Sequence, residues 1–217
     1  MDLLDFARGP ALLWSLVILV LGVAWRLAGV LLQKRRPDYS EPRSTAVAAG
    51  AIGTIFRRMW PRKEFQARTA YSTTLSYVFH IGLAIVVFGF VPHILFVRNL
   101  TGLSWSGLPS GFIYAAGVVT LVALVAALVR RLTHPVLKLL SNFDDYFSWF
   151  VTAAPVVTGL MAVAHFGARY ETILAVHILT VELLFVWFPF GKLMHAVLFA
   201  VSRGTTGALF ARKGAAT

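Results

Sequence analysis

The segment Val78–Ile94, VFHIGLAIVVFGFVPHI, is almost wholly apolar yet contains two histidines, His80 and His93. An apolar stretch of this kind belongs in lipid, where about 20 helical residues cross the hydrocarbon core of a bilayer. An ionisable side chain inside a membrane helix is energetically unfavourable and is a functional candidate by default. The segment therefore predicts a membrane fold and indicates where function is to be sought.

The whole chain has the composition of an integral membrane protein. Of its 217 residues, 58% are hydrophobic and 13% are charged, whereas soluble domains are about half apolar and about a quarter charged. Cysteine is absent, which excludes disulfides, thiolate zinc sites and cysteine-ligated iron–sulfur clusters within this chain. The net charge of +11 comes from basic residues beside apolar blocks, so we expect a topology signal and no nucleic-acid partner.

Five apolar blocks are long enough to cross a bilayer, and we expect helices because a spanning segment must satisfy its own backbone hydrogen bonds. The blocks cover residues 11–32, 73–97, 110–129, 146–167 and 173–200. The first ten residues, MDLLDFARGP, lack the basic region and cleavage site of a signal peptide, so we expect the first helix to be retained. The sequence predicts one all-α membrane domain over residues 1–217, a five-helix transmembrane bundle.

Basic residues mark alternate connections between these blocks. The first connection, residues 33–72, carries nine: Lys34, Arg35, Arg36, Arg43, Arg57, Arg58, Arg62, Lys63 and Arg68. The third carries Arg130, Arg131 and Lys138, whereas the second and fourth carry only Arg98 and Arg169. Because cytoplasmic loops are rich in Lys and Arg, we expect the N-terminus outside, 33–72 as a cytoplasmic loop and the C-terminus inside. The expected location is a bacterial or archaeal cytoplasmic (inner) membrane.

Residues 44–70 mix apolar and basic side chains but are too short to cross the bilayer. Three interpretations stay open for them. The segment lies at the inner interface with Phe56 and Trp60 among the lipid headgroups, or it is a solvated basic loop, or it is a docking surface for a cytoplasmic partner.

The positions of four histidines predict two facing pairs. His177 and His195 are 18 residues apart, which is five turns of a straight helix, so both point the same way about 27 Å apart unless Pro189 bends the inner end. His80 and His195 lie on the inner side, and His93 and His177 lie nearer the outer side. Two imidazoles facing each other across a bundle suit a b-type haem with two axial histidines.

Several residues around the outer pair leave alternatives open. His93 is 13 residues after His80, about 220° around an ideal helix, and only a kink at Pro92 brings it back. His165 is a rival outer ligand, and His134 is expected at the inner interface. Three glycines leave room for a macrocycle or simply allow close helix packing: Gly82, Gly89 and Gly159.

The motifs VFHIG around His80 and HILTVELLFVWFPFGKLMH from His177 to His195 resemble the gamma subunit of respiratory nitrate reductase. They also resemble its relatives, the cytochrome b subunits of sulfite-reductase-linked and heterodisulfide-reductase-like membrane complexes. The likeness covers about residues 70–200. One difference is that the family's Gly-His dipeptide is Gly89-Phe90 here, with His93 three residues later. We therefore expect a relative that serves another redox partner.

The resemblance implies two haems b and exchange of electrons between the quinone pool and an iron–sulfur or other redox subunit on the cytoplasmic face. His80 and His195 would hold the inner haem iron, and His177 with His93 the outer one. Glu182, in the fifth block, is a candidate for proton transfer, because a carboxyl buried in lipid is kept neutral and can accept quinol protons. The alternatives for Glu182 are bonds to a neighbouring helix or to Arg26.

A different class of function explains some of the same residues. In this alternative the chain is a small membrane transporter or an assembly anchor, and the histidines serve a proton relay or packing. It accounts for Glu182 but not for the pairing of histidines in both leaflets.

Overall fold

The computed structural model describes residues 2–34 and 38–215, so the predicted topology signals Arg35 and Arg36 lie outside the described residues. Every regular element in the described part is a helix, as the sequence predicts. The elements are α1 (Leu3–Phe6), the π-helical turn η1 (Ala7–Ala11), α2 (Leu12–Leu31), α3 (Val47–Arg57), α4 (Lys63–Gly89), α5 (Val91–Thr101), α6 (Ser110–Thr133), α7 (Pro135–Leu140), α8 (Phe143–Ala164), α9 (Tyr170–Trp187), the 3-10 turn η2 (Lys192–Met194) and α10 (His195–Arg212).

Six helical stretches within the described residues are long and apolar enough to cross a membrane. They are Leu3–Leu31, Lys63–Gly89, Ser110–Thr133, Phe143–Ala164, Tyr170–Trp187 and Lys192–Arg212. Large apolar side chains such as Trp14, Trp25 and Leu13 are about two-thirds exposed on α2 (64%, 66% and 61%), which is expected of a surface facing lipid. The chain thus has the architecture of a multi-pass membrane protein.

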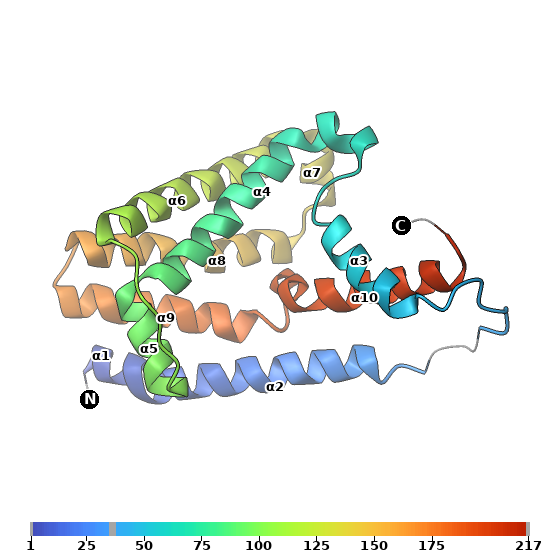
Figure 1. Cartoon of the computed structure of the whole chain (residues 1–217). Coiled ribbons are helices and arrows are strands. Elements are labelled where there is room, and N and C mark those ends of the chain that lie inside the picture. Colours follow the sequence, from blue (N-terminus) through green and yellow to red (C-terminus); the bar gives the residue numbers. More distant parts are fainter. Residues whose placement is uncertain (1, 35–37, 216–217) are drawn as a thin grey trace.

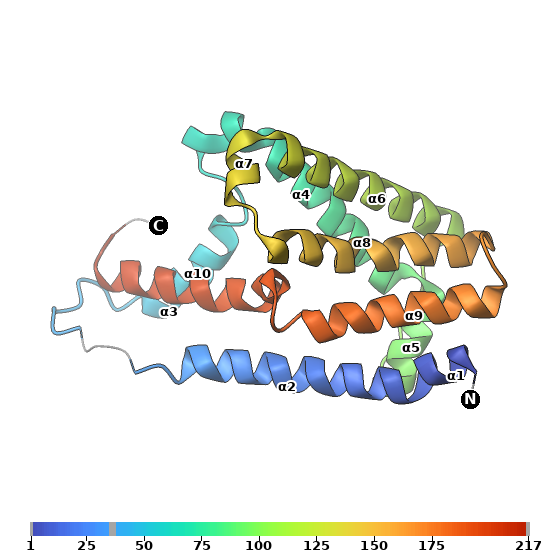
Figure 2. The same cartoon turned by 180° about the vertical axis from the view of Figure 1, so that it is seen from behind.

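The long helices run alternately in opposite directions. In Figure 1, α2, α6 and α9 run from left to right and α4 and α8 from right to left, and Figure 2 shows the same order from behind. The sixth stretch, α10, does not turn back but continues in the direction of α9. The start of α1 and the end of α10 therefore lie at opposite ends of the bundle.

The helices form a row of neighbours that places the histidines. Helix α4 packs on α6, α6 on α8, α8 on α9, and α9 on α2. The core between α6 and α8 contains Leu124, Ala153 and Val156, with Phe79 and Leu83 of α4 against it. Among the described residues α4 and α9 share no extensive contact, since α6 and α8 come between them in this row.

Two predicted blocks are divided in the structure. The block 73–97 is wrong as a single helix, because α4 already begins at Lys63 and ends at Gly89, and a separate α5 follows. The block 173–200 is likewise two helices, because α9 ends at Trp187 and Pro189, without an N–H group, cannot continue its hydrogen bonds. Pro189 is fully buried, and a Cβ on Gly22 of α2 would overlap it, so the turn packs tightly on α2.

The connection 33–72 is not a loop throughout, because it contains α3 and the first turns of α4. Helix α3 packs along α10, where Gly50 and Thr54 lie against Gly207 and Ala211. Small residues allow two helix backbones to approach closely. None of the three interpretations of residues 44–70 included a helix packed on α10; hydropathy carries no signal for such a contact.

Candidate functional site: two histidine pairs

His80 and His195, the pair expected on the inner side and therefore called the inner pair, join α4 to the start of α10. The ring centres of His80 and His195 are 6.1 Å apart, and their planes are nearly perpendicular, at 88°. His80 Nδ1 lies 2.7 Å from the carbonyl oxygen of Ser76, and His195 Nδ1 lies 2.7 Å from that of Lys192. A carbonyl oxygen only accepts, so each Nδ1 carries the proton and each Nε2 keeps the lone pair that binds a metal.

The outer pair joins the first turn of α5 to α9. The ring centres of His93 and His177 are 6.2 Å apart and the rings are nearly parallel, at 19°. His93 Nδ1 donates to the carbonyl oxygen of Val86 at 3.1 Å. His177 Nδ1 lies 3.2 Å from Thr158 Oγ1, which itself donates to the carbonyl oxygen of Ala154 at 2.8 Å and so can accept from the imidazole. Both outer rings therefore also present Nε2.

A break in the backbone brings His93 to His177. Phe90 has an extended conformation (φ −80, ψ 124) between α4 and α5, and Pro92 lies in the first turn of α5. Pro92 has no N–H group to donate to Phe88, as a continuous helix would require. The kink predicted next to Pro92 is confirmed, and it turns His93 toward α9.

The outer loop between α5 and α6 stabilises this break. Trp105 Nε1 donates to the carbonyl oxygen of Phe88 at 2.6 Å, and the amide of Leu108 donates to that of Gly89 at 2.8 Å. These are two of the carbonyls that lose their helical partners at the break, and buried carbonyls left unpaired are energetically unfavourable. Trp105 could not be expected at this site from the sequence, since nothing in its spacing relates it to α4.

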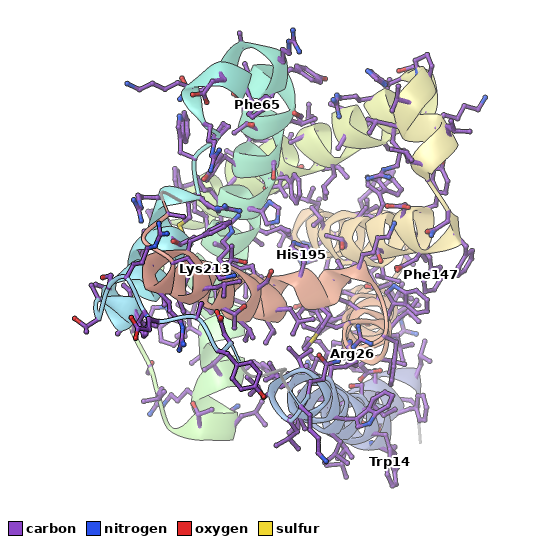
Figure 3. The ribbon with its side chains drawn as sticks, turned by 90° about the vertical axis from the view of Figure 1, so that its right-hand side faces the viewer. Trp14, Arg26, Phe65, Phe147, His195 and Lys213 are labelled. Carbon is purple, nitrogen blue, oxygen red and sulfur yellow. The ribbon has the colours of Figure 1, made fainter. Side chains whose placement is uncertain are left out.

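The straight-helix argument for His177 and His195 is wrong, although the pairs that it predicted are formed. Helix α9 ends at Trp187. The pairs form because α10 continues in the direction of α9 after the turn and begins with His195 (Figure 1). Viewed from the end that carries α10, His195 lies near the centre of the molecule, whereas Trp14 points outward from α2 (Figure 3).

The separation within each pair fits a haem iron. Imidazole nitrogens bind metals at about 2.0 Å, which places the metal about 3 Å from each ring centre and two opposed ring centres roughly 6 Å apart. The described residues hold no group of three or more side chains that could bind a metal ion. Two opposed imidazoles do complete the coordination of an iron that takes its other ligands from a porphyrin. The donor set thus fits a bis-histidine haem.

The three glycines have different surroundings. A Cβ on Gly159 would lie 3.1 Å from Cε1 of His177, so the lack of a side chain at Gly159 leaves room for the outer imidazole. Gly82 and Gly89 lie instead against side chains of α6 and of the outer loop. The close-packing alternative therefore describes Gly82 and Gly89.

The other two histidines lie apart from the pairs. His165 ends α8 in a left-handed conformation (φ 52), and its ring stacks on Tyr170 at 5.2 Å. His134 follows α6 and is exposed. The structure brings His93, rather than its rival His165, to His177.

Glu182 is a buried residue of α9. Its side chain is 5% exposed, and Oε1 has no hydrogen-bond partner among the described residues. Gly22 of α2 lies against Pro189, which follows α9. Ser15, 3% exposed, lies two helical turns before Gly22, and Glu182 lies two turns before Pro189. Ser15 and Glu182 are therefore at about the same height along the bundle. Arg26 is exposed, and no ion pair of the described residues joins it to Glu182.

Comparison with known proteins gives a relative over almost the full length. A protein of Nitratidesulfovibrio vulgaris (strain Hildenborough), whose curated name states no function, is 32% identical over 219 aligned positions. The alignment covers 98% of this chain and 96% of the relative. No family model matches the chain, and no solved structure matches it.

Proposed function

The chain belongs to the same family as this Nitratidesulfovibrio vulgaris protein, and we propose that it is a membrane-anchored b-type cytochrome subunit. It transfers electrons between the quinone pool and an iron–sulfur or other redox subunit. One observation carries the proposal: two histidine pairs have ring centres 6.1 and 6.2 Å apart, and Nδ1 of each imidazole has a hydrogen-bond acceptor on the protein. Haem b, when bound, supplies reversible one-electron chemistry.

The protein's own part is to hold and tune the ligands. A metal-binding histidine generally donates its other ring N–H to a carbonyl, carboxylate or hydroxyl, which fixes the ring and raises its basicity. His80, His93 and His195 do so through backbone carbonyls, and His177 through Thr158. Four histidines fixed in this way argue against the alternative of a proton relay, because a relay needs rings that exchange protons at both nitrogens.

The proposed topology has five crossings, with the N-terminus outside and the C-terminus inside. The direction of α10 supports five rather than six, because a sixth crossing would require α10 to run back against α9. The basic residues of α3, of the start of α4 and of the end of α6 lie at the end of the bundle where α10 begins. By the positive-inside rule this is the cytoplasmic end.

The redox partner is proposed to dock at the basic end, beside the inner pair. The turn between α3 and α4 lies against α4: the ring of Trp60 is 5.8 Å from that of Tyr77, and the Tyr77 hydroxyl donates to the carbonyl oxygen of Met59. Tyr77 lies one helical turn before His80. The connection between α3 and α4, with Arg58 and Arg62, therefore lies close to the inner pair. Such a surface attracts and orients an acidic partner.

The quinone is proposed to react at the outer pair, with Glu182 as a group that takes up protons. A buried carboxyl with an unpaired oxygen supports the role in proton transfer, since such a group is readily kept neutral. Glu182 is five residues after His177, which is about 140° around α9, so the two side chains lie on different faces of the helix.

Cofactor analysis of the purified protein tests the proposal. The protein, produced with a full haem supply, should contain about two haems b, as one bis-histidine site per pair requires. A quinol added to the oxidised protein should give the reduced-minus-oxidised spectrum of a low-spin b-type cytochrome. A folded protein without haem under these conditions would exclude the cytochrome and leave the transporter or anchor alternative.

A further inference from the structure

His195 takes its orientation from a short turn at the inner end of the bundle. The turn covers residues 188–194 and ends in the 3-10 segment Lys192–Met194. The carbonyl oxygen of Lys192 accepts the hydrogen bond from His195 Nδ1 at 2.7 Å. The position of Lys192 therefore determines how the inner imidazole is aimed.

Two carboxylates in the first turn of α8 hold Lys192 at both of its ends. The backbone amide of Lys192 donates to Asp144 Oδ1 at 3.1 Å, and its Nζ forms an ion pair with Asp145 Oδ2 at 2.5 Å. Lys192 is thus fixed through its backbone and through its side chain. Hydrogen bonds to charged groups are among the stronger ones in proteins.

The carboxylates are themselves held in place. Asp144 Oδ1 accepts from Ser148 at 2.7 Å, and Asp145 pairs with Arg131 at 2.9 Å and accepts from the backbone amide of Asn142 at 3.0 Å. The Asp145 side chain is only 7% exposed, which places this ion pair beyond the weak class of fully exposed salt bridges. The network connects α6, α8 and the turn before α10.

We infer that Asp144 and Asp145 are positioning residues for the inner haem ligand, acting through Lys192 on His195. The inference rests on the proposed function. The outer pair bonds to residues outside this network, since His177 bonds to the Thr158 hydroxyl and His93 to the carbonyl oxygen of Val86. Disturbing the carboxylates should therefore change the inner site and leave the outer site as it is.

The test compares Asp145→Asn with Asp145→Glu and with the control Glu171→Gln in the haem-loaded protein. Glu171 is an exposed carboxylate in the first turn of α9, paired with Arg169 at 3.8 Å. Asp145→Asn should raise the midpoint potential of one haem, because it removes a negative charge and loosens the ligand that donates to the iron. The electron paramagnetic resonance (EPR) signal of the same haem should shift, while the other haem is unchanged. Asp145→Glu should restore both properties in part, and Glu171→Gln should alter neither.

Two results would overturn the inference: unchanged potentials and EPR signals in Asp145→Asn, or equal changes at both haems. Where Asp145→Asn does not accumulate, Lys192→Met breaks the same ion pair and should shift the EPR signal of the inner haem alone. Wild-type protein without haem would instead refute the proposed function, so the two failures are distinguishable.

Discussion

The inner and outer histidine pairs have almost the same separation but are built from different local structures. The inner rings are 6.1 Å apart, perpendicular and exposed, and His195 comes from a turn braced by an ion pair. The outer rings are 6.2 Å apart, nearly parallel and half-buried, and His93 comes from a break between two helices. The shared separation is what the proposed haem iron between two imidazoles requires, and that requirement leaves the ring planes free.

The orientation of the planes has a consequence for a low-spin iron. Parallel imidazoles donate into one of two iron d orbitals and separate their energies, whereas perpendicular imidazoles treat the two orbitals alike. The pairs should therefore be spectroscopically distinct, even though their donor atoms are the same.

Removal of one ligand should have the largest effect. His177→Ala should abolish the outer haem signal and His80→Ala the inner one, each lowering the haem content from about two to about one per chain. Stability should fall too, because a bound cofactor stabilises only the folded state. His165→Ala, at a histidine outside both pairs, is the control and should keep both haems. Full haem content in either paired variant would refute that assignment.

Glu182→Gln should act on quinol oxidation. A proton-accepting group contributes a factor of about 100 or more to rate, so quinol-driven reduction should slow by roughly that factor, with both haem spectra retained. Arg26→Gln, at an exposed arginine that forms no ion pair with Glu182 among the described residues, should change little. Stopped-flow reduction over a range of pH measures both variants, and an unchanged rate for Glu182→Gln throughout would remove Glu182 from the proton path.

Reversal of the inner charges should affect partner binding alone. Changing Arg57, Arg58, Arg62 and Lys63 to glutamate should slow association with the redox partner by about tenfold or more, since electrostatic steering is worth factors of 10 to 10³. Quinol-driven haem reduction should persist. The topology needs a separate check with a C-terminal reporter, and reversal of the outer Arg98 and Arg169 is the control. If the partner still binds while quinol no longer reduces the haem, the quinone site would lie at the basic end and the partner site at the opposite end.

A bulkier residue at Gly159 should have the smallest effect, and only on the outer pair. A Cβ there approaches the His177 ring to 3.1 Å, so Gly159→Val should tilt the ring and shift the outer EPR signal. Gly29→Val, at a helical glycine with open space around it, should shift neither signal. A change in the inner signal of Gly159→Val would mean that the two sites are mechanically coupled.

The histidine pairs could be predicted from sequence because depth in a membrane follows from position along alternating helices. The ring orientations could not, since they depend on the turn at Lys192 and on the hydrogen bond from Trp105 to Phe88 across the outer loop. Hydropathy gave the apolar blocks but not their breaks, which Pro92 and Pro189 indicated instead. The tertiary contacts that replace the lost helical hydrogen bonds carry no signal in the sequence. Hydropathy also gave no signal for α3, whose packing on α10 depends on small residues far apart in the chain.

EPR spectroscopy of the oxidised wild-type protein tests the central claim most directly. The account predicts two low-spin haem signals of equal intensity: a rhombic one from the near-parallel pair His93 and His177, and a strongly anisotropic one from the perpendicular pair His80 and His195. Each should disappear in the variant of its own pair. A single low-spin signal, or two signals that survive the loss of His80 and of His177, would contradict the assignment of one haem to each pair.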